Sequence, residues 1–544
     1  MNLTQLPTEV LEDIVSRLMP ESFEDVALAC KATWHASSRF VAEHNAMRKR
    51  FRHFRFDEVP EDISEDQTTP DDQDQQVFNF HENRAHGDAC ELPARGKTAI
   101  TPQEKMERSK LPASGEIKLY NAIDLLEYIA EHPVAARYIE AADFSHDSLD
   151  MDAEDETPLI GKGRSALSSL VQSSSYLAEM GFDPAAWLDK MDSWLDGHAD
   201  IFLLTLLPNA RRLNLSLRFS NYLFDEECLD LLRLIVKRAK KYHESAGPPA
   251  SLAKLEDLQA RDEFDGHSAF SLHGVLELMK IPSVCEFAGA SFVALDGSRH
   301  REEASGEPLS SNIKRVDLVC SVLGPNYAAK FLPRMKNLTA LNLHWEVKYG
   351  ESRFTDVGAL LANIQAAVGS TLGELSVIGI GDLEEAGSTL WDMSGFQRLR
   401  TLHLDLEVLC GPKYNPEDEV LDDSTDIMRD DEAHPRLVDV LPSSIEQAAI
   451  YISSFGPDGY PEIDWLLAGM AEEHTVKLPK LRELKICVPR ERSDMVYHGV
   501  SSDGPGPVPE GDKALHRSVE ACGGIARVEV GGMAEFETRT FEMA

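Results

Sequence analysis

Along most of this chain, apolar residues recur in one short phrase: an apolar residue, two others, a second apolar residue, one other, and a third apolar residue. Clear copies begin at Leu338, Leu399 and Leu481. Weaker copies begin at Ala136, Ala210, Leu252, Val284, Ile313, Leu372, Ile445 and Ile525. Apolar residues at alternate positions predict a half-buried strand whose intervening side chains lie on the other face. The phrase therefore predicts a series of short strands.

The segments between these strands show helical spacing. Residues 222–237 and 357–368 place apolar residues three and four positions apart, which predicts amphipathic helices. A strand followed by a helix, repeated, predicts an α/β fold in which helices cover a parallel sheet and each unit buries its neighbour's core. The alternative is an ordinary doubly wound α/β domain, but the parallel strands of such domains read as continuous apolar runs.

The first fifty residues have a different pattern, which predicts three short helices. Pro7 suits a helix start because it lacks an N–H that the first turn would leave unpaired. An apolar stripe follows, made of Val10, Leu11, Ile14, Val15 and Leu18. Ser22, with Asp25 three residues later, is a candidate cap for a second helix, and a third can run from about Trp34 towards Phe51. A unit this small buries too little surface to be stable alone, so we expect an apolar face that needs a partner.

The chain of 544 residues has a formal net charge of −39 that is unevenly distributed. The segment 57–116 is acidic and has few periodic apolar positions, which predicts a disordered linker. It separates a helical unit, 1–56, from a strand–helix array, 117–544, whose acidic stretches at 143–157 and 411–435 we interpret as loop insertions. So strong a negative charge argues against a nucleic-acid partner.

Cysteine usage and hydropathy indicate a cytoplasmic or nuclear protein. The eight cysteines are scattered and contain no close pair, which is typical of reduced thiols. The N-terminus lacks the pattern of a signal peptide, and the longest apolar run, 201–207, is far too short to span a membrane. A basic cluster at 48–55 is interleaved with Phe51 and Phe54. It suggests either a nuclear-import or nucleic-acid patch or, as we prefer, the solvated end of the third helix with both rings packed inward.

Motifs for enzyme chemistry are missing from the sequence. It contains no phosphate-binding loop, no nucleophile elbow, no HExxH motif and no pair of cysteines at zinc-ligand spacing. We therefore expect no catalytic residues, no metal and no cofactor, although an enzyme whose site has no recognisable motif remains an alternative.

The N-terminal unit resembles a known motif in the order and spacing of its residues. Leu6-Pro7-x-Glu9-Val10-Leu11-x-x-Ile14-x-x-x-Leu18, followed by Pro20, Phe23, Cys30-Lys31 and Trp34, resembles the F-box. F-box proteins dock on a Skp-type adaptor and so join a cullin–RING ubiquitin ligase. The resemblance implies a bundle and adaptor-binding face formed by Leu6, Pro7, Glu9, Ile14, Leu18, Phe23, Cys30 and Trp34. The alternative is an amphipathic helix pair that packs on the rest of the protein.

The array resembles the degenerate leucine-rich repeats of fungal F-box proteins. From Leu252 to Leu399 its copies lie 25 to 34 residues apart, near the period of such repeats. It departs from them at Arg218, Glu346 and Glu407, where Asn or Cys is usual. Side chains between the apolar positions of each strand would line a concave face that binds a protein target. These residues are Asn214, Ser216, Asn342, His344, Trp345, His403, Asp405 and Lys485.

Together these resemblances imply the non-catalytic substrate-recognition subunit of a ubiquitin ligase. The alternative is a leucine-rich-repeat scaffold for protein interactions that has no ligase role and whose N-terminal helices merely cap the first repeat. Whether residues 1–56 pack on the array or stand apart from it helps to distinguish the two.

Overall fold

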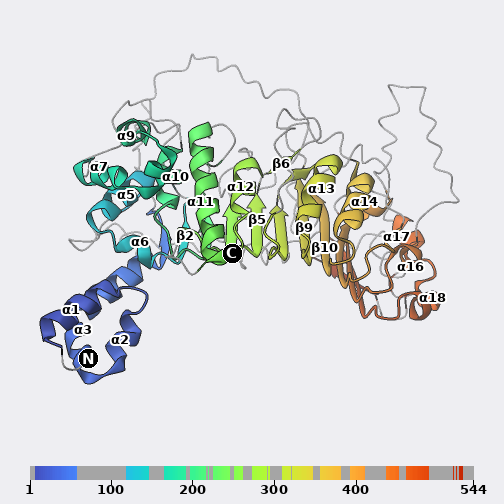
Figure 1. Ribbon diagram of the computed structural model, residues 1–544. Coiled ribbons are helices and arrows are strands. Elements are labelled where there is room, and N and C mark those ends of the chain that lie inside the picture. The colour runs from blue at the N-terminus through green and yellow to red at the C-terminus, as the bar shows by residue number, and fades with distance from the viewer. Residues whose placement is uncertain are drawn as a thin grey trace, which may run out of the picture.

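The computed structural model is a mixed α/β protein built on one long parallel sheet (Figure 1). It describes residues 6–57, 118–145, 147, 164–191, 197–215, 219, 225–245, 250–260, 272–290, 292–294, 309–319, 321–346, 356–380, 392–410, 436–452, 461–488, 519, 522 and 526–530.

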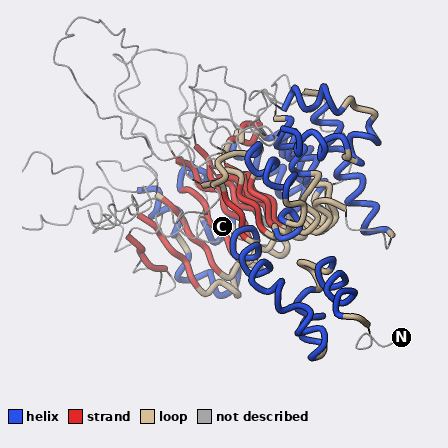
Figure 2. The backbone as a smooth tube through the Cα atoms, turned by 90° about the vertical axis from the view of Figure 1, so that its left-hand side faces the viewer, coloured by secondary structure: helices blue, strands red, loops and turns tan. Residues whose placement is uncertain are grey.

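Each strand of the sheet pairs in parallel with the strands that precede and follow it in the order of the chain (Figure 2). The strands of this sheet are β1 (His53–Arg55), β2 (Ala141–Asp143), β3 (Arg212–Asn214), β4 (Asp257–Ala260), β5 (Glu286–Ala290), β7 (Arg315–Val319), β9 (Ala340–Glu346), β10 (Glu374–Ile380), β11 (Thr401–Asp405), β12 (Gln447–Tyr451), β13 (Glu483–Val488) and β14 (Ala526–Val530). A second, two-stranded sheet joins β6 (Val293–Ala294) to β8 (Val322–Leu323).

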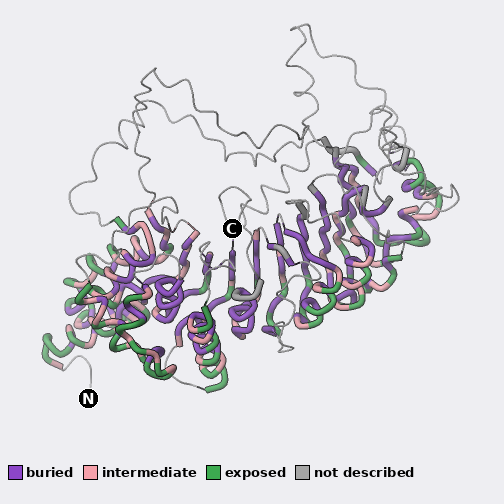
Figure 3. Tube along the Cα trace, turned by 90° about the horizontal axis from the view of Figure 1, so that it is seen from above, coloured by how far each residue is buried: buried purple, intermediate pink, exposed green. Residues whose placement is uncertain are grey.

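The predicted α/β fold with a parallel sheet is confirmed, and each copy of the apolar phrase leads into one strand. In β9, for example, Leu341 and Leu343 are buried, and so is Leu338, which lies two residues before the strand. Of the described strands, β1 and the two strands of the second sheet, β6 and β8, were not predicted. Most helices lie along one side of the row of strands (Figure 3), so one continuous core fills the space between helices and sheet.

The described helices begin at residues of several kinds, only some of which have a side chain that caps the first turn. They are α1 (Thr8–Arg17), α2 (Phe23–Ala29), α3 (Lys31–Phe51), α5 (Ala122–Glu131), α6 (Ala135–Tyr138), α7 (Arg164–Gln172), α8 (Ser175–Met180), α9 (Pro184–Met191), α10 (His198–Leu204), α11 (Glu226–Glu244), α12 (Leu272–Leu278), α13 (Pro325–Phe331), the 3₁₀ helix η3 (Leu332–Arg334), α14 (Val357–Val368), α15 (Leu406–Cys410), α16 (Leu437–Val440), α17 (Pro461–Leu467) and α18 (Met470–Lys477). The predicted helix 357–368 is confirmed as α14. The one predicted at 222–237 starts at Glu226 because the Asp225 side chain caps it, accepting the N–H of Cys228 at 2.8 Å.

One edge of the sheet carries a ladder that fixes how the units stack. The carbonyl of the residue before one strand accepts two successive N–H groups of the next unit, as Arg52 does from Glu140 and Ala141. Over the first four units the side chains along this edge alternate in charge, so Arg52 lies 3.1 Å from Glu140 and Arg211 lies 3.0 Å from Glu256. Because parallel strands place equivalent residues about 4.8 Å apart, alternating charges attract where like charges would repel.

The first three helices form a small bundle at one end of the molecule (Figure 1). Ser22 precedes α2 as predicted, but its side chain makes no capping hydrogen bond. Phe51 and Phe54 in the basic cluster are buried, which confirms that both rings pack inward. Since α3 leads directly into β1, the sheet begins at His53, inside the range 1–56 predicted for the helical unit.

Asp57 joins the two sides of the predicted linker 57–116. Its Oδ2 accepts the N–H of Leu119 at 2.8 Å, and its own N–H bonds to the carbonyl of Leu119. The rest of the predicted linker, and most of the two acidic stretches interpreted as loops, lie outside the described residues. None of the described helices is long and apolar enough to cross a membrane.

Candidate functional site

The N-terminal bundle exposes apolar side chains that its own core does not use. Of the predicted stripe on α1, Leu11 and Val15 are buried, Ile14 and Leu18 are half-buried, and Val10 is exposed. The described chain has five exposed large apolar side chains, and three of them lie in this bundle: Val10, Leu28 and Trp34. Leu28 is 73% exposed and Trp34 is 48% exposed.

The residues predicted for adaptor binding fall into two groups. Pro7, Glu9 and Trp34 are exposed and accessible to a partner, and Leu6, Ile14, Leu18 and Cys30 are half-buried. Phe23, by contrast, is buried and stacks on His44 with ring centroids 4.5 Å apart, so its place is in the bundle's core. Cys30 is the N-cap of α3 and bonds to Thr33, whose hydroxyl lowers the pKa of the Cys30 thiol.

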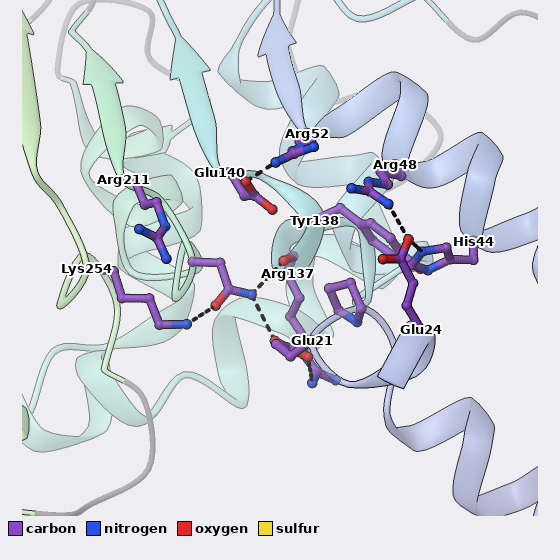
Figure 4. A pocket seen from close by; sticks show the side chains of 12 residues that line it. Glu21, Glu24, His44, Arg48, Arg52, Arg137, Tyr138, Glu140, Arg211 and Lys254 are labelled. Carbon is purple, nitrogen blue, oxygen red and sulfur yellow. Dashed lines mark hydrogen bonds and ion pairs between the residues drawn. The ribbon is translucent and has the colours of Figure 1, made fainter. Parts of the chain in front are cut away.

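A polar pocket lies where the bundle meets the first units of the sheet (Figure 4). Its volume is about 280 Å³. Twelve residues line it: Pro20, Glu21, Glu24, His44, Arg48, Arg52, Arg137, Tyr138, Glu140, Asn209, Arg211 and Lys254. The Arg and Lys side chains outnumber the carboxylates by five to three, although the whole chain is strongly acidic.

Contacts across this pocket hold the bundle against the sheet. Glu21 accepts hydrogen bonds from Arg137, at 3.1 Å from its Nε, and from Asn209, at 2.8 Å. Nδ1 of His44 lies 2.8 Å from the hydroxyl of Tyr138, and burial raises the pKa of Tyr138 to about 12, so the phenol stays protonated. The described residues 6–56 thus pack on the array, as the scaffold alternative predicts.

We expect the junction to loosen in acid because of Glu21. Burial alone would raise the pKa of this carboxyl, but hydrogen bonds from Arg137 and Asn209 outweigh burial and lower it. A carboxyl whose pKa is lowered by folding stabilises the folded state above its unfolded pKa, near 4.5, and loses that contribution as the pH falls through the folded pKa. Glu21→Gln should therefore show at neutral pH the loosened junction that the wild type shows only in acid.

Amide hydrogen exchange in α6 measures this loosening. The expected acceleration in Glu21→Gln is about two- to fivefold, as is usual for a partly exposed ion pair. Glu24→Gln is the matched control, because Glu24 pairs with Arg48 within the bundle. Equal exchange in the two variants would show that Glu21 does not hold the junction.

The sheet face opposite the core carries the residues predicted to bind a target. Asn342, Ser376 and His403 are register partners on adjacent strands. The same row continues to Lys485 on β13 and to Asn214 on β3. His344 and Asp405 lie two positions further along their strands. Ser216 lies outside the described residues, as does the side chain of Trp345.

Part of this inner face is more enclosed than predicted. Asn214, His403 and Lys485 are half-buried, whereas Asn342, His344 and Asp405 are buried. One physical reason is a second apolar cluster on the same face, formed by Ile378, Ala449, Tyr451 and Cys487. The apolar phrase does not predict this cluster, because its members lie between or beyond the apolar positions of the phrase.

The buried polar groups of this face are only partly satisfied. Nδ2 of Asn342 donates to Asp317 at 2.5 Å. Oδ1 of Asn342, Nε2 of His344 and Oγ of Ser376 have no hydrogen-bond partner among the described residues. Burial lowers the pKa of His344 to about 4, so its imidazole is neutral at physiological pH. Ser376 lies four residues after Leu372, as Asn342 lies four residues after Leu338. The rule that predicted Asn342 would therefore also have identified Ser376.

The bundle offers exposed apolar side chains, and the inner face offers neutral hydrogen-bonding groups. Comparison of the chain with protein-family models and with curated proteins gave no match.

Proposed function

We propose that this protein is the substrate-recognition subunit of a cullin–RING ubiquitin ligase. In this proposal the N-terminal bundle is an F-box that docks a Skp-type adaptor, and through it a cullin. The stacked strand–helix units are a degenerate leucine-rich-repeat solenoid that holds a protein target. The observation that carries the proposal is the exposure of Val10, Leu28 and Trp34 on a bundle whose sequence resembles the F-box.

The exposed side chains favour a docking unit over a simple cap. A cap needs only the face that meets the array, which here consists of the Glu21 and His44 contacts and the strand β1. It has no use for an indole that is about half exposed on the bundle, since large apolar groups are costly to leave in water. The scaffold alternative therefore accounts for the junction but not for Trp34.

The inner face supports the target-binding part of the proposal. A buried polar atom without a partner costs about 1 to 3 kcal/mol, and Asn342, His344 and Ser376 each have one among the described residues. A bound segment of another protein would contact the half-buried members of the row, Asn214, His403 and Lys485, because the partnerless atoms themselves have almost no accessible surface. The neutral state of His344 suits it to accept or donate a hydrogen bond rather than to pair with an acid.

Adaptor binding by a double variant tests the proposal. Pro7→Ala combined with Trp34→Ala should weaken binding to a purified Skp-type adaptor by about thirtyfold, because losing an interface anchor commonly costs about 2 kcal/mol. Isothermal titration or surface plasmon resonance measures the effect.

Trp465→Ala is the matched control. Trp465 is similarly exposed, at 40%, but belongs to α17 near the other end of the sheet. It should leave adaptor binding unchanged. If the wild type does not bind the adaptor, or if the double variant binds as tightly as the wild type, the F-box assignment is wrong and the scaffold alternative gains.

A further inference from the structure

We propose that His198, Asp225 and Cys228 form a binding site for a divalent transition-metal ion of the zinc type. One nitrogen, one carboxylate oxygen and one sulfur converge there, all within 4.8 Å of one another. Nε2 of His198 lies 3.5 Å from Oδ2 of Asp225. A zinc ion binds such atoms at about 2.0 to 2.3 Å, which places its ligands about 3.5 Å apart. The three ligand atoms therefore need to move only slightly closer together to bind the ion.

Two helix starts bring these residues together. His198 is the first residue of α10 and follows Gly197, whose φ of +61° is a conformation that favours glycine. Asp225 caps α11, and Cys228 is the third residue of that helix. The two helices are neighbours on the same side of the sheet (Figure 1). The ligands thus come from two chain segments nearly thirty residues apart, where no sequence motif would show them.

The two oxygens of Asp225 have separate tasks. Oδ1 accepts the N–H of Cys228 at 2.8 Å, which fixes the carboxylate and starts the helix. Oδ2 points towards His198 and is the oxygen that would bind the ion. His198 and Cys228 are buried while Asp225 is exposed, so the ion would enter past Asp225.

A bound ion would displace Lys190 from its contact with Asp225. Lys190 lies 3.5 Å from Oδ2 of Asp225, but its closer contact is with Glu227, at 2.6 Å. It can therefore keep a carboxylate partner when Asp225 turns to a metal. Cys228 would bind as a thiolate, releasing its proton to solvent as the metal–sulfur bond forms.

The set of donor atoms selects the kind of ion. A thiolate and an imidazole favour zinc and its neighbours over magnesium or calcium, which prefer oxygen ligands alone. The site lies within the array and away from both surfaces assigned to partner binding. Its effect would be to tie α10 to α11 and so stabilise this end of the array.

Cobalt(II) added to the metal-free full-length protein tests the site, because thiolate ligation gives cobalt a charge-transfer band in the near ultraviolet. One equivalent should produce this band together with the visible bands of a tetrahedral ion. It should also quench Trp187, whose ring centroid lies 4.6 Å from that of His198. Zinc should displace the cobalt and raise the melting temperature.

Two variants and a control decide the outcome. Asp225→Asn keeps the oxygen that caps α11 but loses the charge, and should weaken cobalt binding at least about tenfold. Cys228→Ala should abolish the charge-transfer band, whereas Cys285→Ala, a half-buried thiol elsewhere on the array, should keep it. If Cys228→Ala does not fold, the titration of the wild type and Asp225→Asn is sufficient. No band in the wild type, or equal affinity in Asp225→Asn, would show that the three residues are only a hydrogen-bonded cluster.

Discussion

Replacing Leu375 with alanine should lower the free energy of unfolding by about 3 kcal/mol. Leu375 lies in β10, in register between Leu341 on one neighbouring strand and Leu402 on the other, and all three are fully buried. Removing a buried leucine side chain leaves a cavity, and such changes typically cost about 2 to 5 kcal/mol. Because both neighbours are themselves held by the stacked strands, they have little freedom to fill the space.

Chemical denaturation followed by circular dichroism measures this loss. Glu374→Ala is a suitable control, since Glu374 precedes Leu375 on the same strand and its carboxylate forms a partly exposed ion pair with Arg315. It should change the stability by no more than about 1 kcal/mol. A stacked array is stabilised through neighbouring units, so hydrogen exchange should show the loss first in the strands next to β10. A loss below 1 kcal/mol for Leu375→Ala would mean that this strand does not belong to the core.

The strands were predictable because one apolar phrase serves two purposes in most of the described units. Its first residue, such as Leu338, fills the core before the strand, and the next two, Leu341 and Leu343, face the helices. That requirement repeats wherever one unit stacks on another, so it is visible in the sequence even where the copies are weak. β1 was missed although the phrase also occurs there as Phe51-x-x-Phe54-x-Phe56, with all three rings buried, because it follows α3 directly and was interpreted as the end of that helix.

The sites were less predictable. Periodicity shows on which face of a helix or strand a residue lies, but not whether other side chains bury it there. Val10 and Leu11 belong to the same predicted stripe, yet only the second is buried. On the inner face the pattern correctly predicted that Asn342 and His403 lie in one row. It did not predict that Asn342 is buried and His403 only half-buried, because burial depends on side chains from neighbouring strands. The junction pocket depends on contacts such as Glu21 with Asn209, which are 188 residues apart and follow no local signal.

His344 should make the array sensitive to moderate acid. Its side chain is buried in β9, and burial lowers its pKa from the ordinary 6.5 to about 4. Between these two values the unfolded chain binds a proton at this histidine and the folded chain does not. Stability therefore falls as the pH drops from about 6.5 towards 4, because acid favours the state that binds more protons. The lowering corresponds to about 3 kcal/mol by pH 4.

His344→Gln isolates this contribution, because glutamine keeps a polar side chain of similar reach but does not titrate. Unfolding free energies of the wild type and the variant, measured by denaturant titration at pH 7 and at pH 4.5, should differ in their change with pH. Carboxyl groups elsewhere titrate in both proteins and cancel in that comparison. The wild type should lose about 2 to 3 kcal/mol more than the variant. Equal losses would mean that the imidazole takes up its proton in the folded state, and hence that the inner face around β9 is open to water rather than enclosed.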